Sequence, residues 1–158
     1  METKRKVEVR PATAADAATV GRLVHRLLEI VVPPEKLMAE ADAVETAGRL
    51  LRPGGGLEGY LAEAGGEAVG VITLTELHAV FARGAFGEIA ELYVEPAWRS
   101  ARVGEQLVEQ AKVHGRARGW SRLELSAPLA GSAGAERAWA FYRRLGFGEV
   151  GPRMMLKL

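Results

Sequence analysis

The sequence predicts an α/β fold in which helices pack around a mixed sheet, and it predicts a single domain over residues 1–158. Three observations lead to this prediction. A chain of 158 residues has the length of one domain with one substantial core. Several stretches alternate apolar and polar residues, as strands do. Other stretches repeat apolar residues at helical spacing, and Gly- or Pro-rich turns separate the two kinds of stretch.

The chain begins with a predicted strand that leads into a helix. Residues 7–10 favour β structure, and Thr13 with Asp16 three residues later is close to a capping box, which marks the start of a helix. Apolar residues recur at helical spacing over residues 20–30, and two prolines at 33–34 end this helix.

A second helix and a hairpin follow. The helix is predicted over residues 37–51, before a Pro-Gly-Gly-Gly break. Strands 57–64 and 68–77 are joined by Gly65-Gly66, a dipeptide that tolerates positive φ in a tight turn. Residues 76–87 are a connection whose strand content the pattern leaves open. The remaining predicted elements are a strand over 89–94, a helix over 102–118, a strand over 122–126, a helix over 136–145 and a final β region over 147–150 and 154–158.

Composition narrows the class of protein. Hydrophobic residues make up 48% and charged residues 26%, which is typical of a globular protein, and no apolar run approaches the ~18 residues that span a bilayer. Residues 1–6 are basic but lead into no apolar segment, so we expect no signal peptide and a cytoplasmic location. A net charge of +1 provides no field for nucleic acid or a membrane, so neither is expected as a partner.

Cysteine is absent, which excludes disulfides, thiolate metal sites and a cysteine acyl-enzyme intermediate. His25, His78 and His114 are scattered without metal-ligand spacing, so no metal is expected. His78 is kept as a minor candidate base because it lies just upstream of strand 89–94.

The most informative stretch is residues 91–104, where an apolar strand runs through one short turn into an amphipathic helix. The first amides of a helix have no internal partner, and the helix dipole adds partial positive charge there. Arg99 and Arg102 add two cations to this turn. The stretch therefore predicts a phosphate-binding site.

The order Arg-x-x-x-x-Gly after Tyr-Val-x-Pro resembles the Arg/Gln-x-x-Gly-x-Gly/Ala pyrophosphate loop of the GNAT superfamily of acyl-coenzyme A-dependent N-acetyltransferases. Arg102 stands where the family usually has its first glycine, and Gly104 keeps its expected position. A glycine there reaches positive φ freely, whereas an arginine does so only with strain.

Two further segments resemble the same family in the right order. Residues 9–16 resemble the first strand feeding a first helix. Residues 136–147 resemble the late segment Asn-x-x-Ala-x-x-Phe/Leu-Tyr-x-x-x-Gly-Phe, although Ala135 occupies the position of the asparagine and cannot make its hydrogen bond. The residues in register with that segment are Ala138, Phe141, Tyr142, Gly146 and Phe147.

The resemblance implies a mostly antiparallel, twisted sheet flanked by helices, with acetyl-coenzyme A as co-substrate. It further implies transfer of the acetyl group to a primary amine by direct attack within a ternary complex. The backbone of a bulged strand would bind the pantetheine arm, and the loop would bind the pyrophosphate. The residues matched to these two functions are Leu92, Tyr93 and Val94 for the first, and Arg99, Ser100, Ala101, Arg102, Val103 and Gly104 for the second.

Three residues are candidates for catalysis. Tyr142 takes the place of the family tyrosine that protonates the leaving thiolate, and the alternative is a packing role for its ring. Glu88 and Glu91 are candidate bases, but their odd spacing places them on opposite faces of a regular strand. Phe86-Gly87-Glu88-Ile89 resembles a motif of the histone-acetylating branch, which favours Glu88, whereas a bulge would bring Glu91 to the same face. Both carboxylates could instead be ordinary surface charges.

The acceptor is left open as a small-molecule or peptide amine, because residues 31–52 and 76–87 carry no recognised motif. A homodimer is also left open. A non-catalytic acyl-coenzyme A-binding sensor or partner-binding module on the same fold is the alternative that Arg102 and Ala135 favour. A nucleotide-binding module is a weaker alternative, because the chain has neither a P-loop nor a Gly-x-Gly-x-x-Gly turn.

Overall fold

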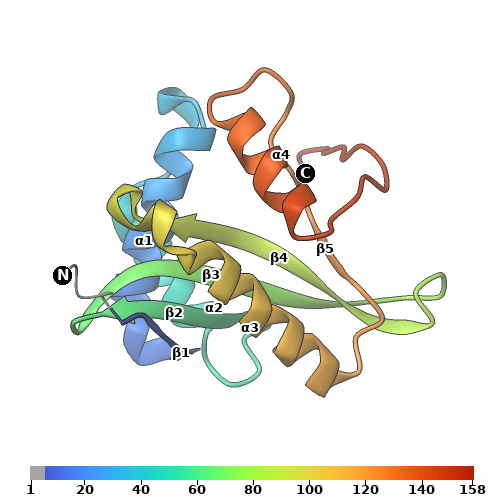
Figure 1. Cartoon of the computed structure of the whole chain (residues 1–158), viewed down its shortest axis with the longest axis horizontal. Helices are drawn as coiled ribbons and strands as arrows, with labels where there is room; N and C mark the ends of the chain where they lie inside the picture. Colours follow the sequence, from blue (N-terminus) through green and yellow to red (C-terminus); the bar gives the residue numbers. More distant parts are fainter. Residues whose placement is uncertain (1–5) are drawn as a thin grey trace. The chain divides into compact units, whose positions relative to one another are not determined.

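A computed structural model describes residues 6–158 of the chain (Figure 1). The basic start of the chain, up to residue 5, lies outside the described residues. Internal contacts divide the chain into two compact units, Met1–Leu125 and Ser126–Leu158. A single domain over residues 1–158 stays a prediction.

The first unit contains a five-stranded sheet in the order β1-β2-β3-β4-β5. Neighbouring strands are antiparallel from β1 to β4, and only β5 runs parallel to β4. The predicted mixed, mostly antiparallel sheet is therefore confirmed. Its strands are β1 (Glu8–Ala12), β2 (Glu58–Ala64), β3 (Glu67–Ala79), β4 (Gly84–Val94) and β5 (Leu123–Leu125).

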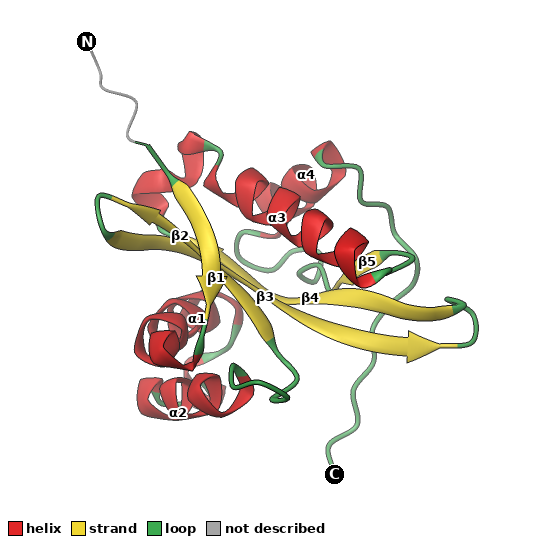
Figure 2. Cartoon of the chain, turned by 90° about the horizontal axis from the view of Figure 1, so that it is seen from below, coloured by secondary structure: helices red, strands yellow, loops and turns green. Residues whose placement is uncertain are grey.

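Helices cover both faces of this sheet, as Figure 2 shows. Helices α1 (Ala17–Val31) and α2 (Glu40–Leu50) pack on one face, and α3 (Val103–Arg118) packs on the other. The α3 side chains of Val103, Leu107, Val108 and Ala111 are buried, and those of Val20 and Leu23 on α1 are buried as well. Apolar helix faces on a sheet are the arrangement that the sequence pattern predicts, so the α/β fold class is confirmed.

Two local predictions in the first unit are also confirmed. The Thr13 amide donates to Asp16 Oδ2 (2.9 Å), which completes the capping box before α1. Hydrogen bonds from the Arg10 guanidinium lower the pKa of this carboxyl to about 2. The Gly65-Gly66 turn has φ of 59° and 83°, so it joins β2 and β3 through a left-handed turn that favours glycine.

The connection over residues 76–87 proves to be strand on both sides of a short turn. Pairing between β3 and β4 continues out to Ala79 and Gly84. Arg83 turns the chain between the two arms with φ of 57°. The hairpin extends β4 well upstream of the predicted start at residue 89.

The second unit contains helix α4 (Ala135–Arg144), close to the predicted bounds. The predicted final β region over 147–150 and 154–158 is wrong, because the described residues after Leu125 contain no strand. A strand forms only where the backbone hydrogen-bonds to a neighbouring strand, and an alternating apolar pattern alone does not show that such a neighbour exists. The apolar side chains from Val150 onward are instead largely exposed, at 80% for Val150 and 92% for Met154.

Candidate functional site

The strand β4 contains a bulge at Ala90. Leu74 pairs with Ile89 and Thr73 pairs with Glu91, so Ala90 is an extra residue with no partner of its own on β3. A bulge was expected within residues 92–94. It occurs two residues earlier because the register between β3 and β4 shifts at Thr73.

Because β4 is bulged and not regular, Glu88 and Glu91 do not point to opposite faces, and the alternative arrangement on one face holds. Glu88 pairs with Thr75, and Glu91 pairs with Thr73. Thr73 and Thr75 are two residues apart on a regular strand and therefore share a face. The extra residue shifts the alternation by one, so both glutamates lie on the face that α1 and α2 cover.

Beyond the bulge, one edge of β4 is open. The ladder between β4 and β5 ends at the pair Ile89 and Leu125. The Glu95 amide donates to Val69 O on the β3 side (2.9 Å). Since backbone groups of alternate residues point to alternate edges, those of Leu92 and Val94 point to the open edge. These are the groups that an extended ligand could bind.

The loop after β4 is a 3₁₀ helix, Pro96–Ala101, followed directly by α3. Arg102 joins the two with φ of 58°, the left-handed conformation that the resemblance assigns to a glycine. Ser100 and Ala101 are exposed, while the Val103 side chain is buried in the core, so only its backbone faces the loop.

The first amides of α3, at Val103, Gly104 and Glu105, have no acceptor within the helix. The Arg102 side chain does not cap them: it is 82% exposed and its Nε lies 3.9 Å from Glu105 Oε2. This helix start therefore keeps amides and a nearby guanidinium available to an anion such as a pyrophosphate.

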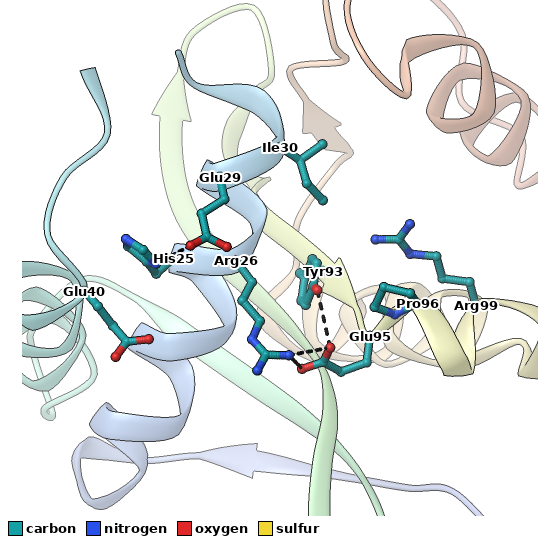
Figure 3. A pocket seen from close by; sticks show the side chains of 9 residues that line it. All are labelled: His25, Arg26, Glu29, Ile30, Glu40, Tyr93, Glu95, Pro96 and Arg99. Carbon is teal, nitrogen blue, oxygen red and sulfur yellow. Dashed lines mark hydrogen bonds and ion pairs between the residues drawn. The ribbon is translucent and has the colours of Figure 1, made fainter. Parts of the chain in front are cut away.

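A pocket of about 620 Å³ lies beside the end of β4, on the α1 side of the sheet (Figure 3). It brings together side chains from α1, α2, the end of β4 and the following loop. Its lining contains cations, carboxylates, one tyrosine and two apolar residues. The lining residues are His25, Arg26, Glu29, Ile30, Glu40, Tyr93, Glu95, Pro96 and Arg99.

An ion pair forms one wall of this pocket. Arg26 Nη1 donates to both carboxylate oxygens of Glu95 (2.6 and 2.8 Å), and Tyr93 Oη donates to Glu95 Oε2 (3.4 Å). The hydrogen bond from Arg26 to Glu95 raises the pKa of this arginine, and burial raises the pKa of the Tyr93 phenol. Both groups therefore keep their protons near neutral pH and can act as hydrogen-bond donors.

Arg99 lies at the rim of the same pocket. Its Nε donates to Val94 O (3.1 Å), and its guanidinium lies 5.9 Å from the centre of the Tyr93 ring. Figure 3 shows this side chain across the pocket from Glu29 and Ile30 on α1. Arg99 was expected only as a ligand of the pyrophosphate, and its side chain also lines this pocket.

The sequence did not identify most residues of the pocket. Arg26 and Glu95 are 69 positions apart, and only the packing of α1 on β4 joins them. His78 lies outside the pocket: it shares a β3 face with Glu76, opposite the face of Thr73, and its Nε2 lies 3.6 Å from Glu76 Oε1. Within residues 6–158, no cluster of three or more His, Asp or Glu side chains could hold a metal ion.

Tyr142 lies on α4 in the second unit. Its ring contacts Phe141 and Phe147 edge-on, with centroids 5.3 and 5.7 Å away. Burial raises the pKa of its phenol, so the group is protonated at neutral pH. Ala135 is buried as the first residue of the helix, after Gly134. The role of Tyr142 as an acid stays a prediction.

The described helices include none that is both long enough and apolar enough to cross a membrane. Solved structures of similar fold cover nearly the whole chain. One is a ribosomal-protein-alanine N-acetyltransferase from Brucella melitensis biovar Abortus 2308, 18% identical with a TM-score of 0.76, covering 97% of this chain and 99% of that one. Another is a GCN5-related N-acetyltransferase from Ralstonia eutropha JMP134, 22% identical with a TM-score of 0.79, covering 96% and 99%. At these identities the likeness shows the fold alone.

Sequence comparison gives the family. The chain is 32% identical over 140 residues to an aminoalkylphosphonate N-acetyltransferase of Salmonella typhimurium, covering 89% of this chain and 84% of the relative. The sequence model of the acetyltransferase (GNAT) family matches residues 24–147. The chain therefore belongs to the GNAT family of acetyltransferases.

Proposed function

We propose that the protein transfers an acetyl group from acetyl-coenzyme A to a small amine that also carries an anionic group, such as an aminoalkylphosphonate. The observation that carries this proposal is the pocket beside β4, whose lining contains both guanidiniums and carboxylates. A zwitterionic acceptor needs both, because a phosphonate pairs with guanidinium groups and an ammonium group pairs with carboxylates. The Salmonella relative is named for this class of acceptor, which supports the proposal.

Acetyl-coenzyme A would supply the acetyl group as an activated thioester. The chain offers backbone groups of Leu92 and Val94 to its pantetheine arm, and the amides at the start of α3 to its pyrophosphate. Tyr93 lies between Leu92 and Val94 on β4. The residues proposed to hold the pyrophosphate remain Arg99, Ser100, Ala101, Arg102, Val103 and Gly104.

The proposed reaction is a direct transfer within a ternary complex, and the absence of cysteine excludes a cysteine acyl-enzyme. The amine nitrogen forms a bond to the thioester carbonyl carbon, and the carbon–sulfur bond breaks. A carboxylate on β4, from Glu91 or Glu88, takes the proton that the amine loses. The Tyr142 phenol gives a proton to the departing sulfur.

A panel of amines tests the acceptor class. We expect kcat/KM for aminomethylphosphonate and 1-aminoethylphosphonate to exceed that for methylamine and ethylamine by about 10²-fold, because charge-assisted hydrogen bonds to the phosphonate are lost in the plain amines. Release of coenzyme A can be followed with a thiol reagent, and the cysteine-free protein contributes no background. Glycine and alanine test whether a carboxylate replaces the phosphonate. Equal rates with ethylamine would contradict the proposed acceptor class.

The cofactor site is tested at Arg99. Arg99→Glu is expected to weaken coenzyme A binding by about 10-fold or more and to reduce the dependence of binding on salt, because a cation near the pyrophosphate becomes an anion. Calorimetry measures both effects. Arg49→Glu, an equal charge change on α2, is the control and should leave both unchanged. Unchanged coenzyme A affinity with a raised KM for the phosphonate would assign Arg99 to the acceptor alone.

A further inference from the structure

Thr73 on β3 is fully buried, at 0% exposed, and it is the one buried polar side chain in the described part of the chain. Its Oγ1 accepts a hydrogen bond from the Glu91 amide (3.0 Å) and donates one to Glu91 Oε2. Both hydrogen-bonding functions of one hydroxyl are therefore used by the same residue. Such a double contact fixes the backbone and the side chain of Glu91 together.

The backbone contact lies directly beside the bulge. Ala90 interrupts the regular ladder, and directly after it the Glu91 amide donates to the Thr73 hydroxyl. A backbone amide inside a sheet requires an acceptor, because leaving it unpaired is costly. Thr75, two residues along the same face, lies opposite Glu88 where the ladder is regular, and so offers a matched position away from the bulge.

We infer that Thr73 is a positioning residue that holds the Glu91 carboxylate where it accepts the proton of the acceptor amine. The inference rests on the proposed function. After the bulge, Glu91 shares its face with Tyr93 and Glu95, which line the pocket. Consecutive residues on one strand face are about 6.6 Å apart, so Glu91 is the next side chain along β4 from Tyr93.

The open edge of β4 favours Glu91 over Glu88. Glu88 lies before the bulge, in the part of β4 that pairs with β5, where Glu124 is its neighbour. Glu91 lies after the ladder with β5 has ended, next to the exposed backbone groups of Leu92. A thioester bound along that backbone would have its carbonyl within reach of an amine placed beside Glu91. A proton acceptor held by a buried hydroxyl keeps its orientation while the amine approaches.

Three variants separate positioning from packing. Thr73→Val keeps the shape of the side chain and removes the hydroxyl, Thr73→Ser keeps the hydroxyl, and Thr75→Val makes the same change at the matched position. Turnover is measured with whichever amine the wild-type enzyme acetylates fastest, so a failure of phosphonate selectivity leaves this test intact. Hydrogen exchange of the Glu91 amide is measured on the same proteins without any acceptor. Thr73→Ala replaces Thr73→Val should the latter not fold.

We expect Thr73→Val to lower kcat about 10-fold or more with little change in KM, and to speed exchange of the Glu91 amide. Thr73→Ser should restore both, and Thr75→Val should resemble wild type. In a Glu91→Gln background, Thr73→Val should cause no further loss, because its effect acts through that carboxylate. Full turnover in Thr73→Val, no rescue by serine, or an additive loss in the double variant would overturn the inference. A wild-type enzyme that acetylates no amine would contradict the proposed function. In that case, unchanged slow exchange of the Glu91 amide in Thr73→Val would still overturn its hydrogen bond to the Thr73 hydroxyl.

Discussion

Glu91→Gln is expected to lower turnover near pH 7 by about 10²-fold or more and to recover part of this loss near pH 9. Alkyl amines are mostly protonated near neutral pH, so a residue that removes the proton matters most there. At higher pH the free amine is abundant, and the reaction depends less on an internal base. Turnover of the two proteins, measured from about pH 6 to pH 10 with saturating acceptor, checks this expectation.

Glu88→Gln is the competing variant, because both glutamates lie on one face of β4. We expect a smaller loss in this variant and no recovery at high pH. Glu45→Gln on α2 is a control for the loss of one carboxylate on the protein, and should have no effect. The reversed pattern would make Glu88 the base, as its Phe-x-Glu-Ile motif suggests. If neither variant recovers at high pH, the proton leaves by another route and both carboxylates lose this role.

The sequence predicted the elements of the sheet and helices well, because each depends on a local periodicity. The α3 face is an example: Val103, Leu107, Val108 and Ala111 recur at helical spacing, and all four are buried. The turn at Gly65-Gly66 is equally local. Residues whose placement depends only on their neighbours in the chain can be predicted in this way.

The position of the bulge could not be predicted, because it is a property of two strands rather than of one. Its position follows from the register in which Thr73 meets Glu91 and Leu74 meets Ile89. An alternating pattern in β4 alone is compatible with several registers. One extra residue then reverses the face of every side chain before it relative to those after it, which is why the two glutamates share a face instead of lying on the opposite faces of a regular strand.

Arg102 shows the opposite case, in which the departure from a motif was informative. The resemblance placed a left-handed residue at this position, and the structure has Arg102 at φ of 58° despite the absence of glycine. A left-handed non-glycine residue costs about 1 kcal/mol, so the surrounding loop and α3 must enforce the conformation. The backbone geometry of the loop is therefore retained, and the guanidinium is added to it.

The pocket required the complete fold. Ile30 fits the helical apolar pattern of α1, yet it is 43% exposed and lines the pocket instead of the core. Arg26 lies four residues before it, one helical turn away, and pairs with Glu95 after β4. A periodic pattern indicates which face of a helix is apolar, but not where the sheet beneath the helix ends. The pocket with charged walls lies at the end of β4, where the sheet no longer covers α1.

Tyr142→Phe is expected to lower turnover by about 10²-fold or more with little change in coenzyme A affinity. The substitution keeps the ring that contacts Phe141 and Phe147 and removes the proton that the departing thiolate would take. A loss in kcat with binding unchanged is the mark of an interaction made in the transition state. Steady-state rates and calorimetry with coenzyme A check both parts of this expectation.

The pH dependence sharpens the test. Burial raises the pKa of the Tyr142 phenol, so the acid form persists above the pH at which an exposed tyrosine loses its proton. The part of the wild-type pH profile that comes from losing this proton should therefore be a fall in turnover at high pH, and Tyr142→Phe should lack that fall. Tyr60→Phe removes a hydroxyl that bonds to His114 Nδ1 (2.9 Å) and serves as the matched control, with turnover close to wild type. Near-normal turnover in Tyr142→Phe would reduce Tyr142 to a packing residue, and the thiolate would then take its proton from solvent.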